Sequence, residues 1–304
     1  MRLAVAATPS LACATLEWIQ ASEHELTLVI TRPDKPAGRG KVLQQSEVAE
    51  WAAQNSVPVV KPVRSLELIP WLGDVDLVVT LAYGVILPEN VLQVPRYGFV
   101  NMHFSLLPAW RGAAPVQRGI ENGDKVSGVT VFQLDVGMDT GPIFVQDSVE
   151  IDPNENSGEL LTRLAIGAPA SLAKALTMIE RGNSPIAQKL EGQSTAKKIS
   201  KAEARINWHQ EAKSVSRKIR AFTPEPGAWA QWKGARIQIL RAEPISLAEP
   251  LAPGHISSAN GELLVGCGEM TALRIDEIAP AGKRTMKANQ WLNGARCQLG
   301  DFFD

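Results

Sequence analysis

The chain has 304 residues, of which 45% are hydrophobic and 21% charged, so it is long enough for one large domain or two ordinary ones. Its longest apolar runs are strand-sized and interrupted, which excludes a predicted membrane span. Three widely separated cysteines without CxxC spacing disfavour disulfides and zinc and fit a reducing cytoplasm. The net charge of −1 combines an acidic part, residues 1–183, with mildly basic residues 184–304, which is compatible with a polyanionic partner or with ordinary surface variation.

Strand and helix signals alternate over residues 1–183. Strands are predicted at residues 2–7, 25–31, 58–62, 74–82, 97–103, 127–135 and 142–151. One helix is predicted to begin at Thr8-Pro9, with Thr8 as the N-cap, and a second to begin at Ser46. Two further helices are predicted at residues 112–123 and 157–182. This alternation predicts a mostly parallel sheet with helices on both faces, in which ligands bind outside the carboxyl ends of the strands.

The character of the sequence changes after residue 183. Residues 184–203 are polar and basic without a clear period, and we interpret them as a linker. A helix over residues 209–222 follows, and prolines stop it. Turn signals at Lys233-Gly234 and Asn260-Gly261 then separate short strands, and residues 287–294 resemble a terminal helix. Residues 204–304 are therefore predicted to form a small antiparallel barrel.

Several common catalytic motifs are absent from the sequence. GxGxxG does not follow the first strand, and the P-loop, GxSxG and HExxH patterns do not occur. None of the four histidines has a second His or a Cys at ligand spacing, so no metal site is predicted. What remains is Asn101-x-His103 at the end of a predicted strand, together with Asp139 in the glycine-containing loop 135–141.

These three side chains have a clear chemical logic. Alternate residues of a strand face the same side, so Asn101 and His103 point together. Asp139 follows a neighbouring strand, and a carboxylate beside an imidazole orients the ring and favours its charged form. The amide donates to an oxyanion without titrating, and no Ser or Cys nucleophile is evident, which fits direct acyl transfer. The residues alone leave open a second interpretation, a hydrogen-bonded corner of the core.

Two stretches, "NMHFSLLPAWRGAAPVQRGI" and "GVTVFQLDVGMDTGPI", closely resemble signatures of the formyltransferases that use 10-formyltetrahydrofolate. Further similarity lies in "TRPDKPAGRGK", "LAYGVILP", "KISKAEARINW" and "IRAFTPEPGAW", so the resemblance covers essentially the whole chain. It implies a Rossmann-like catalytic domain at residues 1–183, a basic linker at 184–203, and an OB-like β-barrel domain that binds tRNA at 204–304. Within the family, the chain looks like the members that formylate charged initiator methionyl-tRNA for translation initiation.

Carried over by position, the resemblance implies a catalytic set of Asn101, His103 and Asp139, with His103 protonated and charged by Asp139. It also implies that four residues line the folate site: Ser105, Leu106, Leu107 and Pro108. No metal is needed, and the resemblance implies a monomer that acts in the cytoplasm. One departure is Ala7, where the family commonly has glycine, which leaves the details of the first turn open.

The segment of residues 32–41 carries four cations and a single acid. Its prolines and glycines make helix or strand unlikely and mobility expected. A solvated charge run is the ordinary interpretation. The resemblance instead implies contact with the acceptor arm of the tRNA, with Arg39 in tRNA discrimination and Lys41 on phosphate.

Three other functions remain as alternatives. The first is the same chemistry on an amino sugar nucleotide, which has no need of a basic loop for tRNA. The second is a glycinamide ribonucleotide transformylase, which usually lacks a second domain. The third is a folate- or tRNA-binding protein without catalysis, against which the complete Asn-His-Asp set argues.

Overall fold

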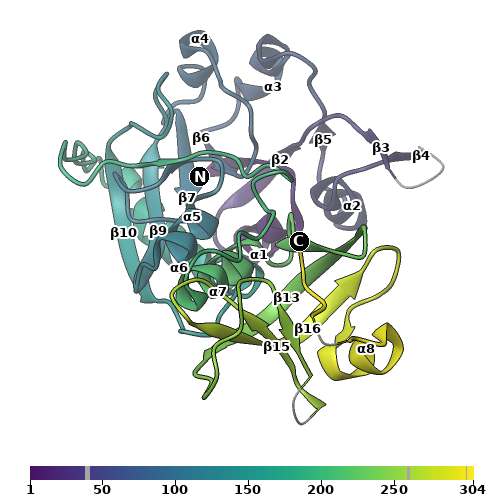
Figure 1. Ribbon diagram of the computed structural model, residues 1–304. Helices are drawn as coiled ribbons and strands as arrows, with labels where there is room; N and C mark the ends of the chain where they lie inside the picture. The colour runs from purple at the N-terminus through teal and green to yellow at the C-terminus, as the bar shows by residue number, and fades with distance from the viewer. Residues whose placement is uncertain (38–41, 259–260, 299) are drawn as a thin grey trace. The chain divides into compact units, whose positions relative to one another are not determined.

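The computed structural model describes residues 1–37, 42–258, 261–298 and 300–304. The chain forms two compact units, which we describe separately (Figure 1). Unit 1 contains Met1–Pro115, Val126–Glu150 and Leu161–Lys197. Unit 2 contains Val116–Lys125, Ile151–Leu160 and Lys198–Asp304, so two short segments that interrupt unit 1 in the sequence belong to it.

Unit 1 is built on a seven-stranded sheet with the order β10-β9-β7-β6-β1-β2-β5. These strands are β1 (Arg2–Ala7), β2 (Glu25–Ile30), β5 (Val59–Val60), β6 (Leu77–Leu81), β7 (Phe99–His103), β9 (Val126–Gln133) and β10 (Ile143–Glu150). All pairings are parallel except those of β9, which is antiparallel to both its neighbours. The strand order reverses between β1 and β6, the kind of place where such sheets bind ligands.

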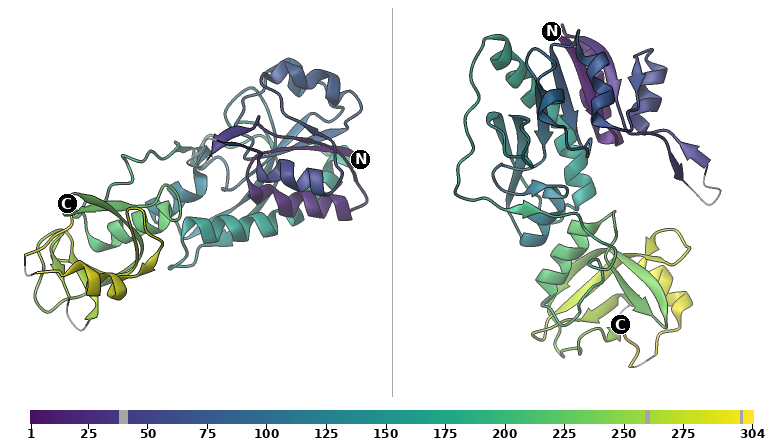
Figure 2. Two further views of the ribbon diagram at one scale, coloured as in Figure 1. Left: turned by 90° about the vertical axis from the view of Figure 1, so that its right-hand side faces the viewer. Right: turned by 90° about the horizontal axis from the view of Figure 1, so that it is seen from above.

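Helices cover both faces of this sheet (Figure 2). They are η1 (Ser10–Ala12), α1 (Cys13–Ala21), α2 (Glu47–Gln54), η2 (Ser65–Leu68), α3 (Ile69–Leu72), α4 (Glu89–Leu92) and α6 (Ser157–Glu180), whose first four residues belong to unit 2. Helix α5 (Pro115–Asn122) belongs to unit 2 except for Pro115. Apolar side chains of η2, α3 and α4 pack in one buried cluster with alternate residues of β1, β2, β6 and β7. The apolar strands β1, which contains three alanines, and β6, which contains three β-branched residues, are buried along nearly their whole length, as expected for a sheet covered on both sides.

Two helix starts test the capping predictions. Ser46 caps α2 as predicted, since its side chain accepts a hydrogen bond from Ala49 N at 3.1 Å. The predicted Thr8 cap is wrong: Pro9 is the cap residue of η1 and no side chain caps it. The Thr8 hydroxyl is buried without a hydrogen-bond partner among the described residues, because the chain enters through a tight 3₁₀ turn.

Part of the basic segment 32–41 forms a strand, which corrects the expectation of no regular structure there. Strand β3 (Lys35–Ala37) pairs antiparallel with β4 (Val42–Gln44). Pro36 is accommodated because this two-stranded hairpin is all edge. Arg39 and Lys41 lie outside the described residues.

The segment predicted as a linker is partly paired with unit 1. Strand β11 (Thr195–Ala196) runs parallel to β8 (Arg111–Gly112). Ile186 forms an antiparallel bridge with Ile143. Residues 186–196 therefore belong to unit 1 and are held against the rest of it by backbone hydrogen bonds.

Unit 2 contains a curled antiparallel sheet with the order β12-β13-β16-β15-β14, and β17 pairs with β16 (Figure 2). The strands are β12 (Trp229–Trp232), β13 (Ala235–Ile245), β14 (Ile256–Ser257), β15 (Leu263–Gly266), β16 (Ala272–Pro280) and β17 (Met286–Lys287), with helices α7 (Ala212–Phe222) and α8 (Ala288–Ala295). The β12–β13 hairpin turns at Lys233-Gly234, as predicted, whereas Asn260 of the second predicted turn lies outside the described residues. The predicted fold class, a Rossmann-like sheet followed by a small OB-like barrel, is confirmed, and the register shifts of β13 bend this sheet.

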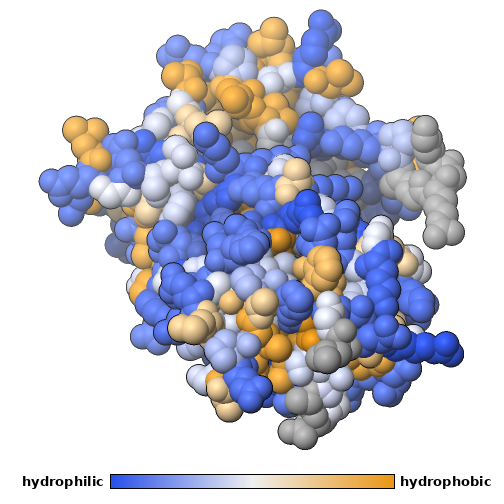
Figure 3. Space-filling model, in the orientation of Figure 1, coloured by the Kyte–Doolittle hydropathy of each residue, from blue (hydrophilic) through white to orange (hydrophobic). Residues whose placement is uncertain are grey.

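The visible face is mostly hydrophilic (Figure 3). Exposed apolar side chains near η2 and α3 are exceptions: Val63, Leu66, Ile69, Trp71 and Ile86. Within the described residues, no helix combines the length and apolarity needed to cross a bilayer.

Candidate active site

The carboxyl ends of β6 and β7 bring polar side chains together. Asn101 and His103 alternate along β7 and face the same side, as predicted. Asn101 is paired in register with Thr80 of β6, and His103 with Thr130 of β9. These positions lie beside the reversal of strand order, where the sheet leaves room for a ligand.

The amide of Asn101 is oriented by its neighbour on β6. Thr80 Oγ1 lies 2.9 Å from Asn101 Oδ1 and 3.0 Å from the Val100 carbonyl oxygen. Oδ1 is directed at this hydroxyl, and Nδ2 forms no hydrogen bond with the described residues. The amide therefore presents two N–H groups that can donate to a ligand oxygen.

The tautomer of His103 follows from its contacts. Nε2 lies 2.9 Å from the Trp110 carbonyl oxygen, which only accepts, so we assign the proton to Nε2. Nδ1 then carries the lone pair, 3.7 Å from Asp139 Oδ2. Nδ1 is thus the atom that can take up a proton, beside a carboxylate that stabilises the resulting cation.

Burial and a neighbouring carboxylate act in opposite directions on the protonation of His103. The side chain is 7% exposed, and burial lowers the pKa of His103 below its ordinary value. The Asp139 carboxylate and the Trp110 carbonyl act in the opposite direction but are outweighed. Burial therefore favours the neutral imidazole at pH 7, because desolvation disfavours the cation more than one carboxylate favours it, and the charging of the ring by Asp139 during transfer stays a prediction.

Asp139 is fixed by the backbone around it. Its Oδ2 accepts a hydrogen bond from Gly112 N at 2.7 Å, and its side chain is 16% exposed. The residue has φ 54°, in the left-handed region that is unfavourable for non-glycine residues. Asp135 holds the same loop by accepting from Gly137 N at 3.0 Å and from the Thr140 hydroxyl at 2.8 Å. The structure thus brings together the three residues predicted as catalytic.

The four predicted folate-lining residues follow His103 directly. Ser105 is buried, and its hydroxyl donates to the Ala109 carbonyl at 2.6 Å, so it holds a turn. Leu107 is also buried, and its N–H donates to Thr130 Oγ1 at 3.2 Å. Leu106 and Pro108 are half-buried and are the side chains of this segment with surface to offer a ligand.

Sequence reasoning missed three groups of this site. The Trp110 carbonyl and the Gly112 N–H belong to the backbone, which a side-chain motif does not reveal. Thr80 lies more than twenty residues before Asn101, and only the sheet register places it beside the amide. A clue was available, since Thr80 is a polar residue at the end of an otherwise apolar strand.

No group of three or more His, Cys, Asp or Glu side chains suited to a metal ion occurs among the described residues. The reactive set is instead an amide, an imidazole and a carboxylate. This set donates hydrogen bonds and moves protons.

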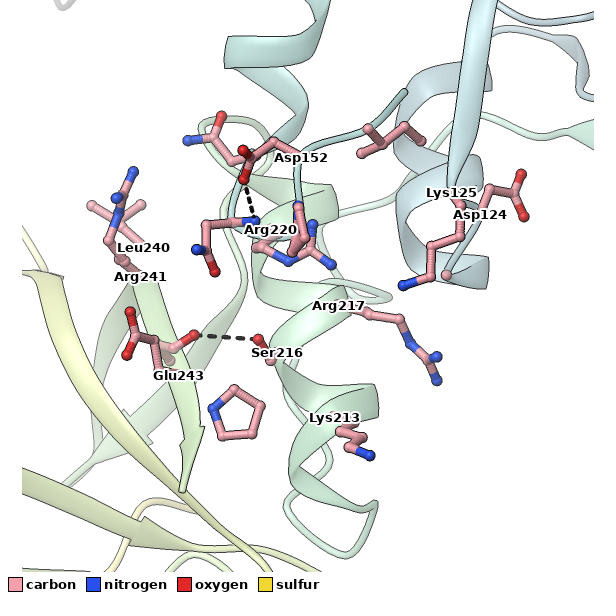
Figure 4. A pocket seen from close by; sticks show the side chains of 17 residues that line it. Asp124, Lys125, Asp152, Lys213, Ser216, Arg217, Arg220, Leu240, Arg241 and Glu243 are labelled. Atoms are coloured by element: carbon pink, nitrogen blue, oxygen red, sulfur yellow. Dashed lines mark hydrogen bonds between the residues drawn. The ribbon is translucent and has the colours of Figure 1, made fainter. Parts of the chain in front are cut away.

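A second cavity, of about 230 Å³, lies within unit 2 (Figure 4). Five cations line it, namely Lys125, Lys213, Arg217, Arg220 and Arg241, against three acids, Asp124, Asp152 and Glu243. Lys213 and Arg217 leave the same side of α7, toward Lys125 (Figure 4).

Two guanidinium groups of this cavity lie close together. Burial, and secondarily the charge of Arg217, lowers the pKa of Arg220 below its ordinary value. Within the part of the chain that is described, the buried Nε of Arg217 has no hydrogen-bond partner. Such an excess of partly desolvated cations favours an anionic ligand.

Comparison with known proteins agrees with this geometry. Residues 1–176 match the "Formyl transferase" family, and residues 198–296 match "Formyl transferase, C-terminal domain". The chain therefore belongs to the formyltransferase family. It is 40% identical to a methionyl-tRNA formyltransferase of Salinispora arenicola, over 99% of both chains, and 42% identical to that of Thermobifida fusca, over 100% of this chain and 99% of the relative.

Solved structures share the fold at lower identity. HypX of Aquifex aeolicus, in complex with tetrahydrofolic acid, superposes with a TM-score of 0.69 at 18% identity, over all of this chain and 50% of HypX. This likeness concerns the fold alone.

Proposed function

We propose that this protein transfers the formyl group of 10-formyltetrahydrofolate to the amino group of methionyl-tRNA, and that Asn101, His103 and Asp139 carry out the transfer. The observation that carries the proposal is the convergence of these three side chains at the ends of β6 and β7. Full-length relatives with about 40% identity bear the name of this activity. The site contains donors for an oxyanion and a proton acceptor, and acyl transfer between a carbonyl and an amine requires both.

The folate supplies the formyl carbon, and its N10 is the leaving nitrogen. As the amine attacks this carbon, negative charge develops on the formyl oxygen, and Asn101 Nδ2 donates a hydrogen bond to it. His103 Nδ1 takes the proton that the amine loses, and Asp139 stabilises the imidazolium that forms. The same proton can then pass to the departing nitrogen, so His103 ends the cycle neutral, as it began.

For the folate, we propose that Leu106 and Pro108 supply apolar contact, while Ser105 and Leu107 shape the segment from within. This division follows their burial, because a side chain that is already enclosed offers little surface to a ligand. The backbone groups of residues 105–108 that are not yet paired are available to polar atoms of the pterin.

For tRNA, we propose two contact regions. Arg39 discriminates the tRNA, and Lys41 contacts phosphate. In unit 2, we propose that Lys125, Lys213 and Arg217 bind backbone phosphate beside the cavity of Figure 4. The protein is further proposed to act as a monomer in the cytoplasm, where charged tRNA is made.

The test is a turnover assay with one formyl donor and several acceptors: charged initiator methionyl-tRNA, a dTDP-linked amino sugar and glycinamide ribonucleotide. We expect turnover with the charged tRNA and none above background with the others. Turnover with the amino sugar instead would show that the formyl acceptor is an amino sugar nucleotide and not methionyl-tRNA. No turnover with any acceptor, together with retained folate binding, would favour a binding protein without catalysis.

A further inference from the structure

Residues 186–196, which we call the strap, connect two loops on either side of His103. At one end, the backbones of Ile186 and Ile143 exchange hydrogen bonds of 2.8 and 2.7 Å. At the other end, β11 pairs with β8. The strap therefore joins the loop that carries Asp139 to the loop that carries Trp110, and all of these segments belong to unit 1.

Gln188 links the two loops through its side chain. Its Nε2 donates to the carbonyl oxygens of Asp139 at 2.9 Å and Gly141 at 2.8 Å. Its Oε1 accepts from Arg111 Nη2 at 2.6 Å and from Nε at 3.1 Å. One half-buried amide thus uses both donors and its acceptor between the loops, an arrangement that fixes their separation.

Ser194 holds the second loop beside Trp110. Its hydroxyl accepts from Trp110 N at 2.9 Å, and its carbonyl accepts from Arg111 N at 2.9 Å. Trp110 is the residue whose carbonyl receives the Nε2 proton of His103. Ser194 therefore fixes the peptide group that carries the Trp110 carbonyl and the peptide group that precedes it.

Both partners of His103 lie in strained backbone. Trp110 has φ 63°, which is rare for a bulky residue, and Asp139 has φ 54°, a region that aspartate enters more often than most residues but at a cost relative to glycine. Such conformations persist where the surroundings over-determine them. The strap hydrogen-bonds both residues, to the Trp110 N–H and to the Asp139 carbonyl.

We propose that the strap positions both partners of His103, and that Gln188 and Ser194 are positioning residues for formyl transfer. Neither side chain contacts the imidazole, so each acts through the residue that it holds. The inference rests on the proposed role of His103 in the transfer and adds the device that keeps its partners in place.

The experiment measures the titration of the His103 ring by NMR in the full-length protein, which contains only four histidines. Gln188→Met keeps the length of the side chain without its hydrogen bonds, and Ser194→Ala removes the hydroxyl. Each should lower the titration midpoint, because Asp139 and the Trp110 carbonyl both raise this pKa and would be held less closely. Single-turnover transfer should fall roughly 10- to 100-fold, the scale of a misplaced catalytic group.

Two further variants provide controls. Gln193→Ala removes an exposed amide of the same strap, whose one contact, to the Lys189 carbonyl at 3.4 Å, stays within the strap, so midpoint and rate should not change. Ser194→Thr keeps a hydroxyl and should restore both quantities relative to Ser194→Ala. The comparison of Ser194→Ala with Ser194→Thr tests the proposal on its own if Gln188→Met does not fold.

An unchanged midpoint, or an unchanged rate, in both Gln188→Met and Ser194→Ala would overturn the proposal, even if their melting temperatures fell. The titration needs no substrate. If the parent protein failed to transfer formyl, the midpoints would still decide whether the strap positions the partners of His103, so the two failures are distinguishable.

Discussion

In the part of the chain that the structure describes, the Thr80 hydroxyl is the one side-chain partner that orients the amide of Asn101. Thr80→Val keeps the shape of the side chain and removes the contact to Asn101 Oδ1. We expect kcat to fall about 10-fold, less than for loss of an oxyanion donor, because the amide remains but is no longer held. The KM for the formyl donor should stay within about twofold of the parent. Thr80→Ser, which retains the hydroxyl, is the matched control, and equal rates for Val and Ser would contradict this role.

The acid–base behaviour of the site centres on His103. Burial lowers its pKa, so the neutral form needed to accept a proton is present at pH 7 and is lost as the pH falls through the lowered value. Asp139→Asn removes a charge that raises this pKa, and the NMR titration midpoint should therefore fall further. Transfer should become slower at all pH values, because the imidazolium loses its stabilising carboxylate.

The linked effect on stability has a definite sign. Unfolding returns the imidazole to its ordinary pKa of about 6.5. The unfolded chain thus binds more protons than the folded one between the two values, and this group makes the fold less stable as the pH falls below about 6.5. A midpoint for His103 above that of an unstructured histidine would contradict the neutral assignment.

At the scale of elements, sequence patterns predicted those parts that depend on local chemistry. Ser46 was identified as a helix cap from its residue type and position, and alternation along β7 placed Asn101 and His103 on one side. Thr8 was not predicted correctly, because the choice of a 3₁₀ entry depends on packing beneath the helix. The effect of burial on the pKa of His103 could not be predicted from the sequence, since desolvation is a sum over the whole surroundings.

The strap shows why pairing over long distances is not readable from one sequence. Residues 184–203 have the polar, basic composition of a linker, yet β11 pairs with a strand more than eighty residues earlier. The backbone supplies these hydrogen bonds, so composition carries little signal for them. Motif matching could find the catalytic side chains, but it could not find the elements that hold them.

The cap of α2 offers a stability test that is separate from catalysis. Ser46→Ala removes the hydrogen bond to Ala49 N and the contact of 2.8 Å with the Thr31 hydroxyl. We expect a loss of about 1 kcal/mol in the free energy of unfolding, the usual cost of losing a serine cap. Urea denaturation measures it, and kcat should not change. A stability equal to that of the parent would show that neither contact contributes.

At the scale of the whole molecule, the acidic residues 1–183 contrast with the basic residues 184–304, and the basic part predicts how tRNA binding depends on salt. Lys213→Ala and Arg217→Ala should each weaken binding and reduce the magnitude of the salt slope by about one, as expected when one phosphate contact is lost. Lys287→Ala is the control, since Lys287 lies in the same unit outside this cavity and pairs with Glu277 at 2.7 Å. If the salt dependence of tRNA affinity were the same in both variants as in the parent protein, the cavity of unit 2 would not contact tRNA.

The central claim is that the amide, imidazole and carboxylate at the ends of β6 and β7 carry out formyl transfer. The most direct measurement is the single-turnover rate of Asn101→Ala with saturating formyl donor and charged initiator tRNA, beside an independent measurement of folate affinity. The account predicts a rate lower by roughly 10²–10³-fold, the effect of losing one oxyanion donor, with folate affinity nearly unchanged. A rate close to that of the parent protein would contradict it.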